Sequence, residues 1–481
     1  MALRAVAGAG AAVLLACTGC TAQPSPTSSS VSAPSPAPSR EEVVAGITEE
    51  GLRARLEELT AATGEAAGYR SAGSEGYERA AILVEDHLTD AGWSVTSTTY
   101  DAPAVVDDAA SSLEVADDRF GADDLRPLLL SPTGDVTGPV VALNGAPGTA
   151  ERPGAGCAPG DYPDLPQSAV VLVPPGGCFR RDQLLAAQQA GAGAFVTYSP
   201  GVPEGVLLRP TLGRAEGLTI PGAWVSEEAA AALAAAAGDD ANLVLTARTE
   251  NRPTRSVVGE LPGSGDEVVL LGAHLDSVVD GPGANDDGSG VAALLEIARS
   301  LGSDGRRATV RVAFWSGEEL GLLGSSRYVS TLSDDERAAI VVYGNADMLA
   351  SPNGFAGVYD EAGAAEGSEA AHDLLRDAVE RAGGTPLPVD LHGGSDHRPF
   401  ALAGIATAGL FSGAVEPVTD QQAEASGATA GEPADPCYHQ PCDDLDNVDL
   451  DLARLLTAAL ADFTVRVADD PSLLAAGGSG P

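Results

Sequence analysis

Lysine is absent from this 481-residue chain, whose 27 basic residues are all arginine. A phosphate-binding P-loop, a Schiff-base cofactor enzyme and a Ser-Lys catalytic dyad each require the amine of a lysine side chain. The sequence therefore excludes these three kinds of site. Two other motifs are also missing: GxSxG, the nucleophile turn of serine hydrolases, and HExxH, the zinc-binding helix of many metalloproteases.

Positive charge is scarce overall, because 69 acidic side chains outnumber the arginines and the formal net charge is -42 at pH 7. Such a surface would repel a nucleic acid and offers no clustered cations to release its counterions. We therefore expect no nucleic-acid partner. The length favours two domains with flanking segments over one large core.

The N-terminus has the pattern of an export signal. Residues 1–20 contain one basic residue, Arg4, then an apolar stretch that is too short to remain as a membrane span. The segment 18–21, TGCT, resembles a bacterial lipoprotein signal. That resemblance implies a lipid anchor on Cys20, which would be the protein's only attachment to a membrane. Lipidation at Cys17 and a soluble secreted form are the alternatives.

A glycine-rich stretch, HLDSVVDGPGANDDGSG at 274–290, follows an apolar run at 268–271 that predicts a strand buried on both faces of a parallel sheet. Apolar residues then recur at helical spacing, so we expect a helix to begin where the stretch ends. Open α/β sheets bind ligands at this edge. His274 and Asp286 could ligate zinc there, with Asp276 orienting the histidine ring. An acidic surface loop is the alternative that this stretch alone leaves open.

Acidic residues follow two further predicted strands. The run 309–315 leads into the pair Glu318 and Glu319. Adjacent residues that leave a strand point to opposite sides, so one glutamate could ligate a metal while the other faces a substrate. The run 339–343 leads in the same way to Asp347. A solvated charge pair is the usual interpretation of two adjacent glutamates, but this pair follows a strand end, as the glycine-rich stretch does.

Two cysteines near the C-terminus, Cys437 and Cys442, are close enough in the sequence to close a tight disulfide loop. Such a bridge would hold Tyr438 and His439 rigid.

Residues 125–240 have a different character, with short apolar runs between Gly and Pro turns. The sequences GCAPGDYPDLPQSAVVLVPPGGCF and LLAAQQAGAGAFVTY resemble the protease-associated domain, a small β/α module that is inserted in several families of secreted exopeptidases. The resemblance implies a disulfide between Cys157 and Cys178, which export permits. Such a module is structural or covers a cleft, so we assign it no catalytic residue.

The motifs HLDS, NDDGSG, EELGLLGS, NADM, SDH and CYHQPCD, in this order, resemble the dizinc aminopeptidase family of bacterial leucyl aminopeptidase and aminopeptidase Y. The resemblance covers most of residues 41–470 outside the inserted module. It implies an α/β fold with a mixed, mostly parallel central sheet flanked by helices. It also implies two zinc ions with five protein ligands, of which Asp286 bridges both ions: His274, Asp286, Glu319, Asp347 and His439.

The same resemblance makes Glu318 the general base, Asp276 the partner of the ligating histidine, and Tyr438 a donor to the oxyanion. Two zinc ions about 3.5 to 4 Å apart can hold a bridging hydroxide, which is a nucleophile at neutral pH. The implied function is an exported zinc-dependent aminopeptidase. Its substrates would be peptides with a free and preferably apolar N-terminal residue. His397 is the alternative to His439, which both the family motif and the disulfide loop favour.

Three alternatives share the scaffold: a carboxypeptidase of the glutamate carboxypeptidase type, a glutaminyl cyclase with one zinc ion, and a catalytically dead peptidase-like binding protein. A carboxypeptidase needs arginine or lysine to hold the terminal carboxylate. The ligand-bearing stretches offer only Arg327 and Arg398, which we expect to be structural. The complete ligand set argues against a dead scaffold, because clustered carboxylates without a metal repel one another.

The expected order along the chain is a lipoprotein-type signal peptide at 1–20, a disordered Ser/Pro/Thr linker at 21–40 and a first part of the peptidase domain at 41–124. The protease-associated domain at 125–240, a second peptidase part with the active site at 241–470 and a disordered tail at 471–481 follow. No pattern predicts an oligomeric state. The loop 419–435 is expected to border the pocket for the first side chain of the substrate.

Overall fold

The structure is a computed structural model, and it describes residues 37–64, 68–107, 111–143, 156–174, 178–198, 210–246, 248–302, 306–360 and 365–474. The chain divides into residues 1–36 and residues 37–481. The predicted signal peptide, its Cys20 and most of the predicted linker therefore lie outside the described residues. Within the described ranges, no helix has the length and apolar character needed to cross a membrane.

An eight-stranded sheet forms the centre of the larger domain, with the strand order β1-β10-β12-β11-β13-β16-β14-β15. Its strands are β1 (Ser94–Asp107), β10 (Arg248–Leu261), β11 (Val268–His274), β12 (Thr309–Trp315), β13 (Ile340–Ala346), β14 (Gly357–Tyr359), β15 (Leu387–Val389) and β16 (Thr407–Phe411). The four strands β12, β11, β13 and β16 are parallel. Antiparallel pairs flank them on both sides. The mixed, mostly parallel sheet predicted from the family resemblance is thus confirmed.

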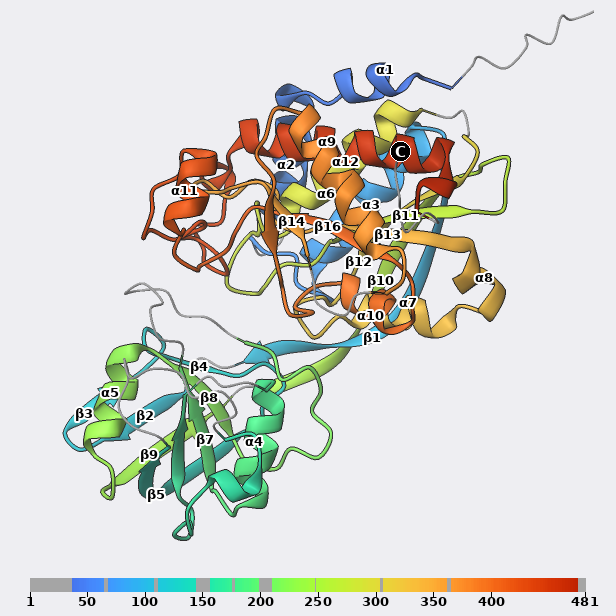
Figure 1. Ribbon diagram of the computed structural model, residues 1–481. Coiled ribbons are helices and arrows are strands. Elements are labelled where there is room, and N and C mark those ends of the chain that lie inside the picture. The colour runs from blue at the N-terminus through green and yellow to red at the C-terminus, as the bar shows by residue number, and fades with distance from the viewer. Residues whose placement is uncertain are drawn as a thin grey trace, which may run out of the picture. The chain divides into compact units, whose positions relative to one another are not determined.

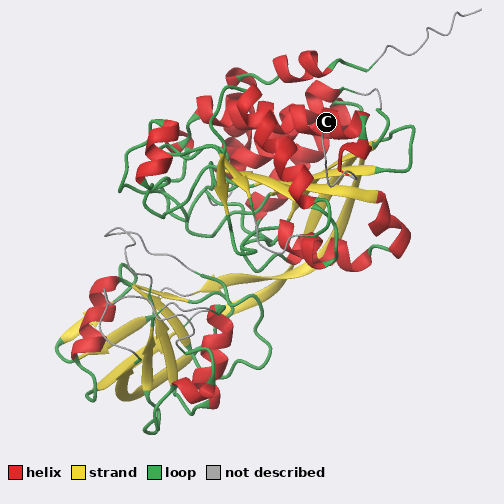
Figure 2. Ribbon diagram, in the orientation of Figure 1, coloured by secondary structure: helices red, strands yellow, loops and turns green. Residues whose placement is uncertain are grey.

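Strand β11 is buried at every residue, as expected for a strand that is covered on both faces. Alternate side chains of a strand point to opposite faces, and Val269 and Leu271 pack in a different cluster from Val268 and Leu270. The first cluster is formed with helices α2 (Glu49–Gly64), α3 (Glu75–Asp90), α6 (Gly288–Leu301), α9 (Ser368–Arg381) and α12 (Leu450–Asp469). Figures 1 and 2 show helices gathered on this side of the sheet.

The opposite face is covered by shorter elements, α7 (Leu323–Thr331) and α10 (His397–Leu402), which contribute Val329 and Phe400. The remaining elements of this domain are α1 (Arg40–Ala45), α8 (Asp334–Ala339), α11 (Asp420–Ser426), and the 3-10 helices η2 (Leu445–Asn447) and η3 (Pro471–Leu474). The predicted disordered tail at 471–481 begins with helix η3, which is ordered because its Leu474 packs in the core. Residues 475–481 lie outside the described residues.

A second eight-stranded sheet forms the inserted module, with the order β3-β2-β9-β5-β6-β7-β8-β4. Its elements are β2 (Ser112–Val115), β3 (Asp118–Phe120), β4 (Leu125–Pro127), β5 (Gly134–Ala142), η1 (Pro159–Asp161), β6 (Val170–Val173), α4 (Arg180–Gln189), β7 (Ala194–Thr197), β8 (Gly222–Val225), α5 (Glu227–Ala235) and β9 (Asp240–Leu245). The long strands β1 and β10 pair with each other along their length and lead into and out of this module.

The predicted boundaries of the module, 125 and 240, fall inside the second sheet. The short strands β2 and β3 pair with each other, and β2 pairs with β9, so the sheet extends from Ser112 to Leu245. The predicted disulfide between Cys157 and Cys178 is present in this module, which confirms that pairing.

Candidate active site

Three neighbouring parallel strands bring the predicted site residues to one edge of the central sheet. His274 is the last residue of β11, Asp347 directly follows β13, and the glutamate pair follows β12. Because these strands are adjacent and parallel, their carboxyl ends meet. Helix α6 begins at Gly288, so its first turn and the preceding Asp286 lie at the same edge, as the helical spacing predicted.

Asp286 lies between two pairs of side chains. Its Oδ1 atom is 3.2 Å from Nε2 of His274, which is itself 3.7 Å from Oδ1 of Asp347. Its Oδ2 atom is 3.0 Å from Nε2 of His439, which is 3.2 Å from Oε2 of Glu319. One carboxylate thus faces two separate groups, each with one imidazole and one further carboxylate. This is the arrangement required of a ligand that bridges two metal ions.

The protonation behaviour of these side chains fits a cation site. Burial lowers the pKa values of His274 and His439, but the surrounding carboxylates outweigh it and raise both above the usual range. Burial opposes ionisation of Asp286, yet hydrogen bonds with the two imidazoles lower its pKa. In Glu319, the Oε1 atom is buried without a hydrogen-bond partner among the described residues. Imidazole and carboxylate ligands in this arrangement suit zinc.

Asp287 also lies within ligand distance of His274 and Asp347. Its carboxylate, however, accepts the backbone N–H groups of His274, Gly290 and Met348, each at 3.0 Å. These three bonds use its oxygens to cap α6 and to tie β11 to the segment after β13. Asp287 therefore holds the site together, and its neighbour Asp286, joined to it by a cis peptide bond, is the better candidate ligand.

Asp276 contacts both the ring of His274 and the turn that carries the two glutamates. Nδ1 of His274 lies 3.0 Å from the backbone carbonyl of Asp276 and 4.0 Å from its carboxylate. The carboxylate instead accepts the N–H groups of Gly317 at 2.8 Å, Glu318 at 3.2 Å and Glu319 at 3.3 Å. Burial raises the pKa of this carboxyl to about 6. Asp276 thus orients the histidine through its backbone and the glutamate turn through its side chain.

Glu318 is half-buried and lines the same cleft as the candidate ligands. Burial raises its pKa well above the usual range, and the nearby carboxylates of Glu319, Asp396 and Asp347 raise it further. A carboxylate whose pKa is raised is a stronger base and is suited to accept and return a proton.

Tyr438 and His439 lie in the loop closed by the predicted Cys437–Cys442 disulfide, which is confirmed. Their rings stack with centroids 3.8 Å apart. Burial raises the pKa of the Tyr438 phenol, so it stays protonated and able to donate a hydrogen bond. The same ring packs against an apolar cluster of the inserted module.

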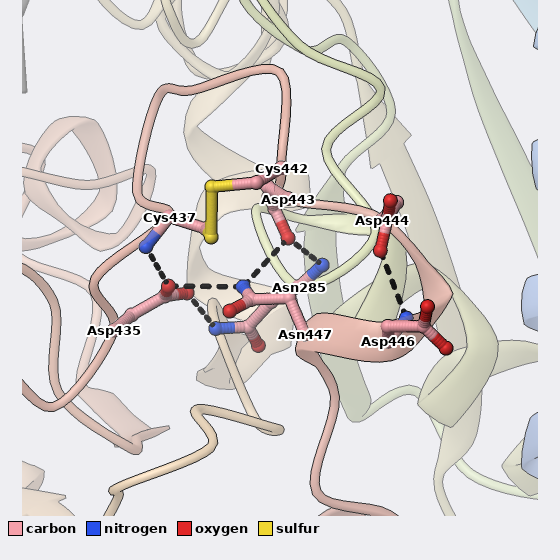
Figure 3. Close-up of a disulfide and its surroundings, with 8 residues drawn as sticks. All are labelled: Asn285, Asp435, Cys437, Cys442, Asp443, Asp444, Asp446 and Asn447. Carbon is pink, nitrogen blue, oxygen red and sulfur yellow. Dashed lines mark hydrogen bonds between the residues drawn. A yellow bond between two sulfur atoms is a disulfide. The ribbon is translucent and has the colours of Figure 1, made fainter.

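The loop is fixed by two buried aspartates, shown in Figure 3. Asp435 accepts the backbone N–H of Cys437 at 2.8 Å and the side-chain amides of Asn447 at 2.9 Å and Asn285 at 2.6 Å. Asp443 accepts the backbone N–H groups of Asn285 and Asp286. Sequence reasoning missed both aspartates and Asn285.

The other histidines lie elsewhere. His397 is buried with its ring edge-on to Tyr359, 4.9 Å between centroids, and belongs to none of the candidate metal groups among the described residues. His372 is buried in α9, His392 is exposed beside Asp390, and His87 lies against Arg55. The structure thus places His439, rather than His397, with the other candidate ligands.

The site opens into a cleft of about 1420 Å³ whose lining includes Thr419 and Gln422 of the predicted pocket loop. Arg327 stacks on Tyr100, with 5.5 Å between its guanidinium carbon and the ring centroid, which fits a structural role. Arg398, by contrast, lines the cleft. Three arginines of the inserted module line it as well, and sequence reasoning did not consider them: Arg180, Arg181 and Arg214.

The mixed α/β fold and the paired imidazole-carboxylate groups define the class of the protein as a metallo-exopeptidase. Residues 256–464 match the model of peptidase family M28, and residues 136–233 match the PA domain. The chain belongs to peptidase family M28, with an inserted PA domain. This membership confirms the predicted family and the predicted enzyme class, a metallo-exopeptidase.

Two relatives illustrate the similarity. The chain is 37% identical over 417 residues to a probable lipoprotein aminopeptidase, LpqL, of Mycobacterium tuberculosis, covering 84% of this chain and 81% of the relative. It is 32% identical over 410 residues to an aminopeptidase of Pseudomonas aeruginosa, covering 82% of this chain and 76% of that one.

Solved structures share the fold. The aminopeptidase from Aneurinibacillus sp. strain AM-1 superposes with a TM-score of 0.71 at 23% identity, over 89% of this chain and 96% of that chain. BSAP, a zinc aminopeptidase from Bacillus subtilis, superposes with a TM-score of 0.66 at 24% identity, over 88% and 96% of the two chains.

Proposed function

We propose that this protein is a dizinc aminopeptidase that removes apolar residues from the free N-terminus of peptides. The observation that carries the proposal is the position of Asp286, whose two oxygens face two imidazole-carboxylate pairs. His274, Asp347 and Oδ1 of Asp286 would hold one zinc ion. Glu319, His439 and Oδ2 of Asp286 would hold the other.

The chain's own residues supply the remaining chemistry. Bound zinc ions provide Lewis acidity and a nucleophile at neutral pH. Glu318 accepts a proton from the attacking water and returns it to the leaving amine, a task that its raised pKa favours. The protonated phenol of Tyr438 donates a hydrogen bond to the tetrahedral oxyanion. The Asp276 carboxylate holds the turn that aims Glu318.

Two features of the cleft support N-terminal recognition. Glu318 and the candidate ligand Asp347 place acidic oxygens at the metal centre, which favours the α-ammonium group of a substrate over a terminal carboxylate. Apolar side chains line part of the same cleft and can bury an apolar first residue: Met348, Phe355, Phe411 and Val415.

Export and lipid anchoring form part of the proposal. Two disulfides favour an oxidising compartment. A relative bears the name of a probable lipoprotein. We infer attachment to the outer face of the cell membrane through Cys20.

A carboxypeptidase is the second candidate, because the arginines that line the cleft are the groups that such an enzyme would use. Blocked peptides separate the two functions. With zinc-loaded enzyme, N-acetylation of a short peptide that begins with Leu should abolish hydrolysis, and amidation of its C-terminus should leave measurable hydrolysis. The opposite pattern would establish the carboxypeptidase, and Arg398 would then be the first residue to replace.

A further inference from the structure

We propose that arginines in the outer cleft bind a carboxylate on the leaving side of the scissile bond, so that the enzyme prefers short peptides with a free C-terminus. This inference rests on the proposed aminopeptidase function and names the substrate class of the same site. Four arginines from both domains line this part of the cleft: Arg180, Arg181 and Arg214 from the inserted module, and Arg398 from the peptidase domain. The binding groups are the guanidinium groups of Arg214 and Arg398.

The balance of charged side chains in the outer cleft differs from that of the whole chain. The chain has 69 acidic residues and 27 arginines. In the cleft lining outside the metal centre, the four arginines instead face three carboxylates, those of Asp182, Asp390 and Glu416. The outer cleft is therefore a local region that attracts an anion, on a protein whose overall field repels one.

Two of these guanidinium groups have no competing partner among the residues that the structure describes. Elsewhere arginines are commonly paired, as Arg255 is with Glu78 and Glu85. The exposed side chains of Arg214 and Arg398, in contrast, form no ion pair and no hydrogen bond with any other residue that the structure describes. Both groups can therefore bind a ligand without breaking an existing contact.

The loop that carries Arg214 is held against the catalytic turn. A Cβ atom added to Gly321 would lie 2.8 Å from Cα of Gly213, so the two backbones approach closely just after the glutamate pair. Arg181 donates from Nε to the backbone carbonyl of Arg214 at 3.2 Å and also to that of Glu216. Arg181 is thus a positioning residue for this loop, and Arg214 is presented to the cleft.

The direction of the substrate follows from the two ends of the cleft. The N-terminal residue lies at the metal centre, beside Glu318 and Asp347. Each following residue extends the chain by at most about 3.6 Å, so a peptide of matching length can place its carboxylate in the outer cleft. There a planar guanidinium can bind it bidentately. A long or amidated peptide presents no carboxylate at that point.

The test compares Leu-Gly peptides of increasing length, each as the free acid and as the amide, with zinc-loaded enzyme. At one length or more, we expect the free acid to have a kcat/KM about three- to fivefold higher than that of the amide, mainly through a lower KM, which is within the range that one exposed ion pair can supply. In the double variant Arg214→Gln, Arg398→Gln this ratio should fall below about twofold. The matched control, Arg53→Gln, replaces an exposed arginine of α2 outside the cleft lining and should keep the wild-type ratio.

Amides with one glutamate on the leaving side form a second arm, which distinguishes a side-chain carboxylate from the C-terminal one. A gain there that depends on the same two arginines also supports the proposal, because the recognised group is the carboxylate. A ratio near one at every length, or a ratio unchanged in the double variant, would overturn it. Failure of the aminopeptidase function is a separate result, in which the zinc-loaded wild-type enzyme does not hydrolyse leucine anilide.

Discussion

Asp443 accepts the backbone N–H of Asp286 at 3.0 Å. It accepts the N–H of the preceding Asn285 at 2.8 Å with its other oxygen. Asp443 directly follows the cysteine that closes the disulfide loop of His439 (Figure 3). One buried carboxylate therefore joins the loop that bears one candidate ligand to the segment that bears the bridging candidate. The position of His439 relative to Asp286 therefore depends on the two hydrogen bonds that Asp443 accepts.

Replacing Asp443 with Asn should weaken zinc binding. The amide cannot accept both N–H groups, and residues that orient metal ligands typically change metal affinity by about 10- to 100-fold when replaced. Isothermal titration of the metal-free protein with zinc measures the effect. Asp444→Asn is the control, since Asp444 is half-exposed and its side chain caps only η2. Equal zinc affinity in the two variants would show that the hydrogen bonds accepted by Asp443 are not needed to position the zinc ligands.

Removing the Cys437–Cys442 bridge, by replacing both cysteines with Ser, should lower activity more than stability. His439 has a φ of 59°, a left-handed conformation that an L-residue adopts only when its surroundings enforce it. The two cysteines are only five positions apart, so loss of the bridge should lower the unfolding temperature only modestly, while it frees the loop that positions Tyr438 and His439. Thermal unfolding and kcat/KM are compared with those of the Cys157→Ser, Cys178→Ser variant. Retained activity in the first variant would make the bridge incidental.

The two adjacent glutamates should separate by function. Glu318→Gln should keep a near-normal zinc content and lower kcat by at least about a hundredfold, through loss of acid-base catalysis. Glu319→Gln should lower the zinc content, because the buried Oε2 beside His439 is a candidate ligand atom. Elemental analysis measures the zinc content of each variant, and steady-state kinetics measures its kcat. Identical behaviour, or the reverse assignment, would contradict the roles.

Tyr438→Phe should lower kcat by about a hundredfold with little change in KM, the effect expected when one oxyanion donor is removed. The ring would still stack on His439, so zinc content should not change. Tyr162→Phe is the control for a buried phenol, because Tyr162 donates to backbone carbonyls within the inserted module. That variant should lose stability and keep its kcat. An unchanged kcat in Tyr438→Phe would remove the phenol from the mechanism.

The sequence could predict the elements that carry the site because their signals are local. The continuous apolar run of β11 and the helical spacing of α6 place His274 and Asp286 without reference to distant residues. The strand ends before Glu318 and Asp347 were predicted in the same way. The confirmed family resemblance supplied the roles of these residues, which stay predictions until the variants are measured.

Contacts between distant segments could not be predicted. Asp443 lies 158 residues from Asn285, and neither residue carries a pattern that points to the other. The carboxylate of Asp276 binds a turn that begins 41 residues later. Arg214 belongs to a module that was expected to carry no catalytic residue, and only the fold brings it to the cleft. Such pairs depend on tertiary packing rather than on local periodicity.

Metal removal tests the centre as a whole. Dialysis against a chelator should abolish activity, and zinc should restore it, because nucleophile and Lewis acid are both supplied by the metal. Stability should follow the same course. The carboxylates of Asp286, Glu319 and Asp347 are buried in the candidate metal groups, so a bound cation that relieves the repulsion of such clustered charges binds the folded state only. At about 100 times the dissociation constant, such binding adds about 2.7 kcal/mol per site to the free energy of unfolding. Isothermal titration of the metal-free protein with zinc should therefore saturate after two equivalents, and calorimetry should show an unfolding temperature that keeps rising with the concentration of free zinc. Saturation after one equivalent would contradict the bridging role of Asp286, and full activity without zinc would contradict the mechanism.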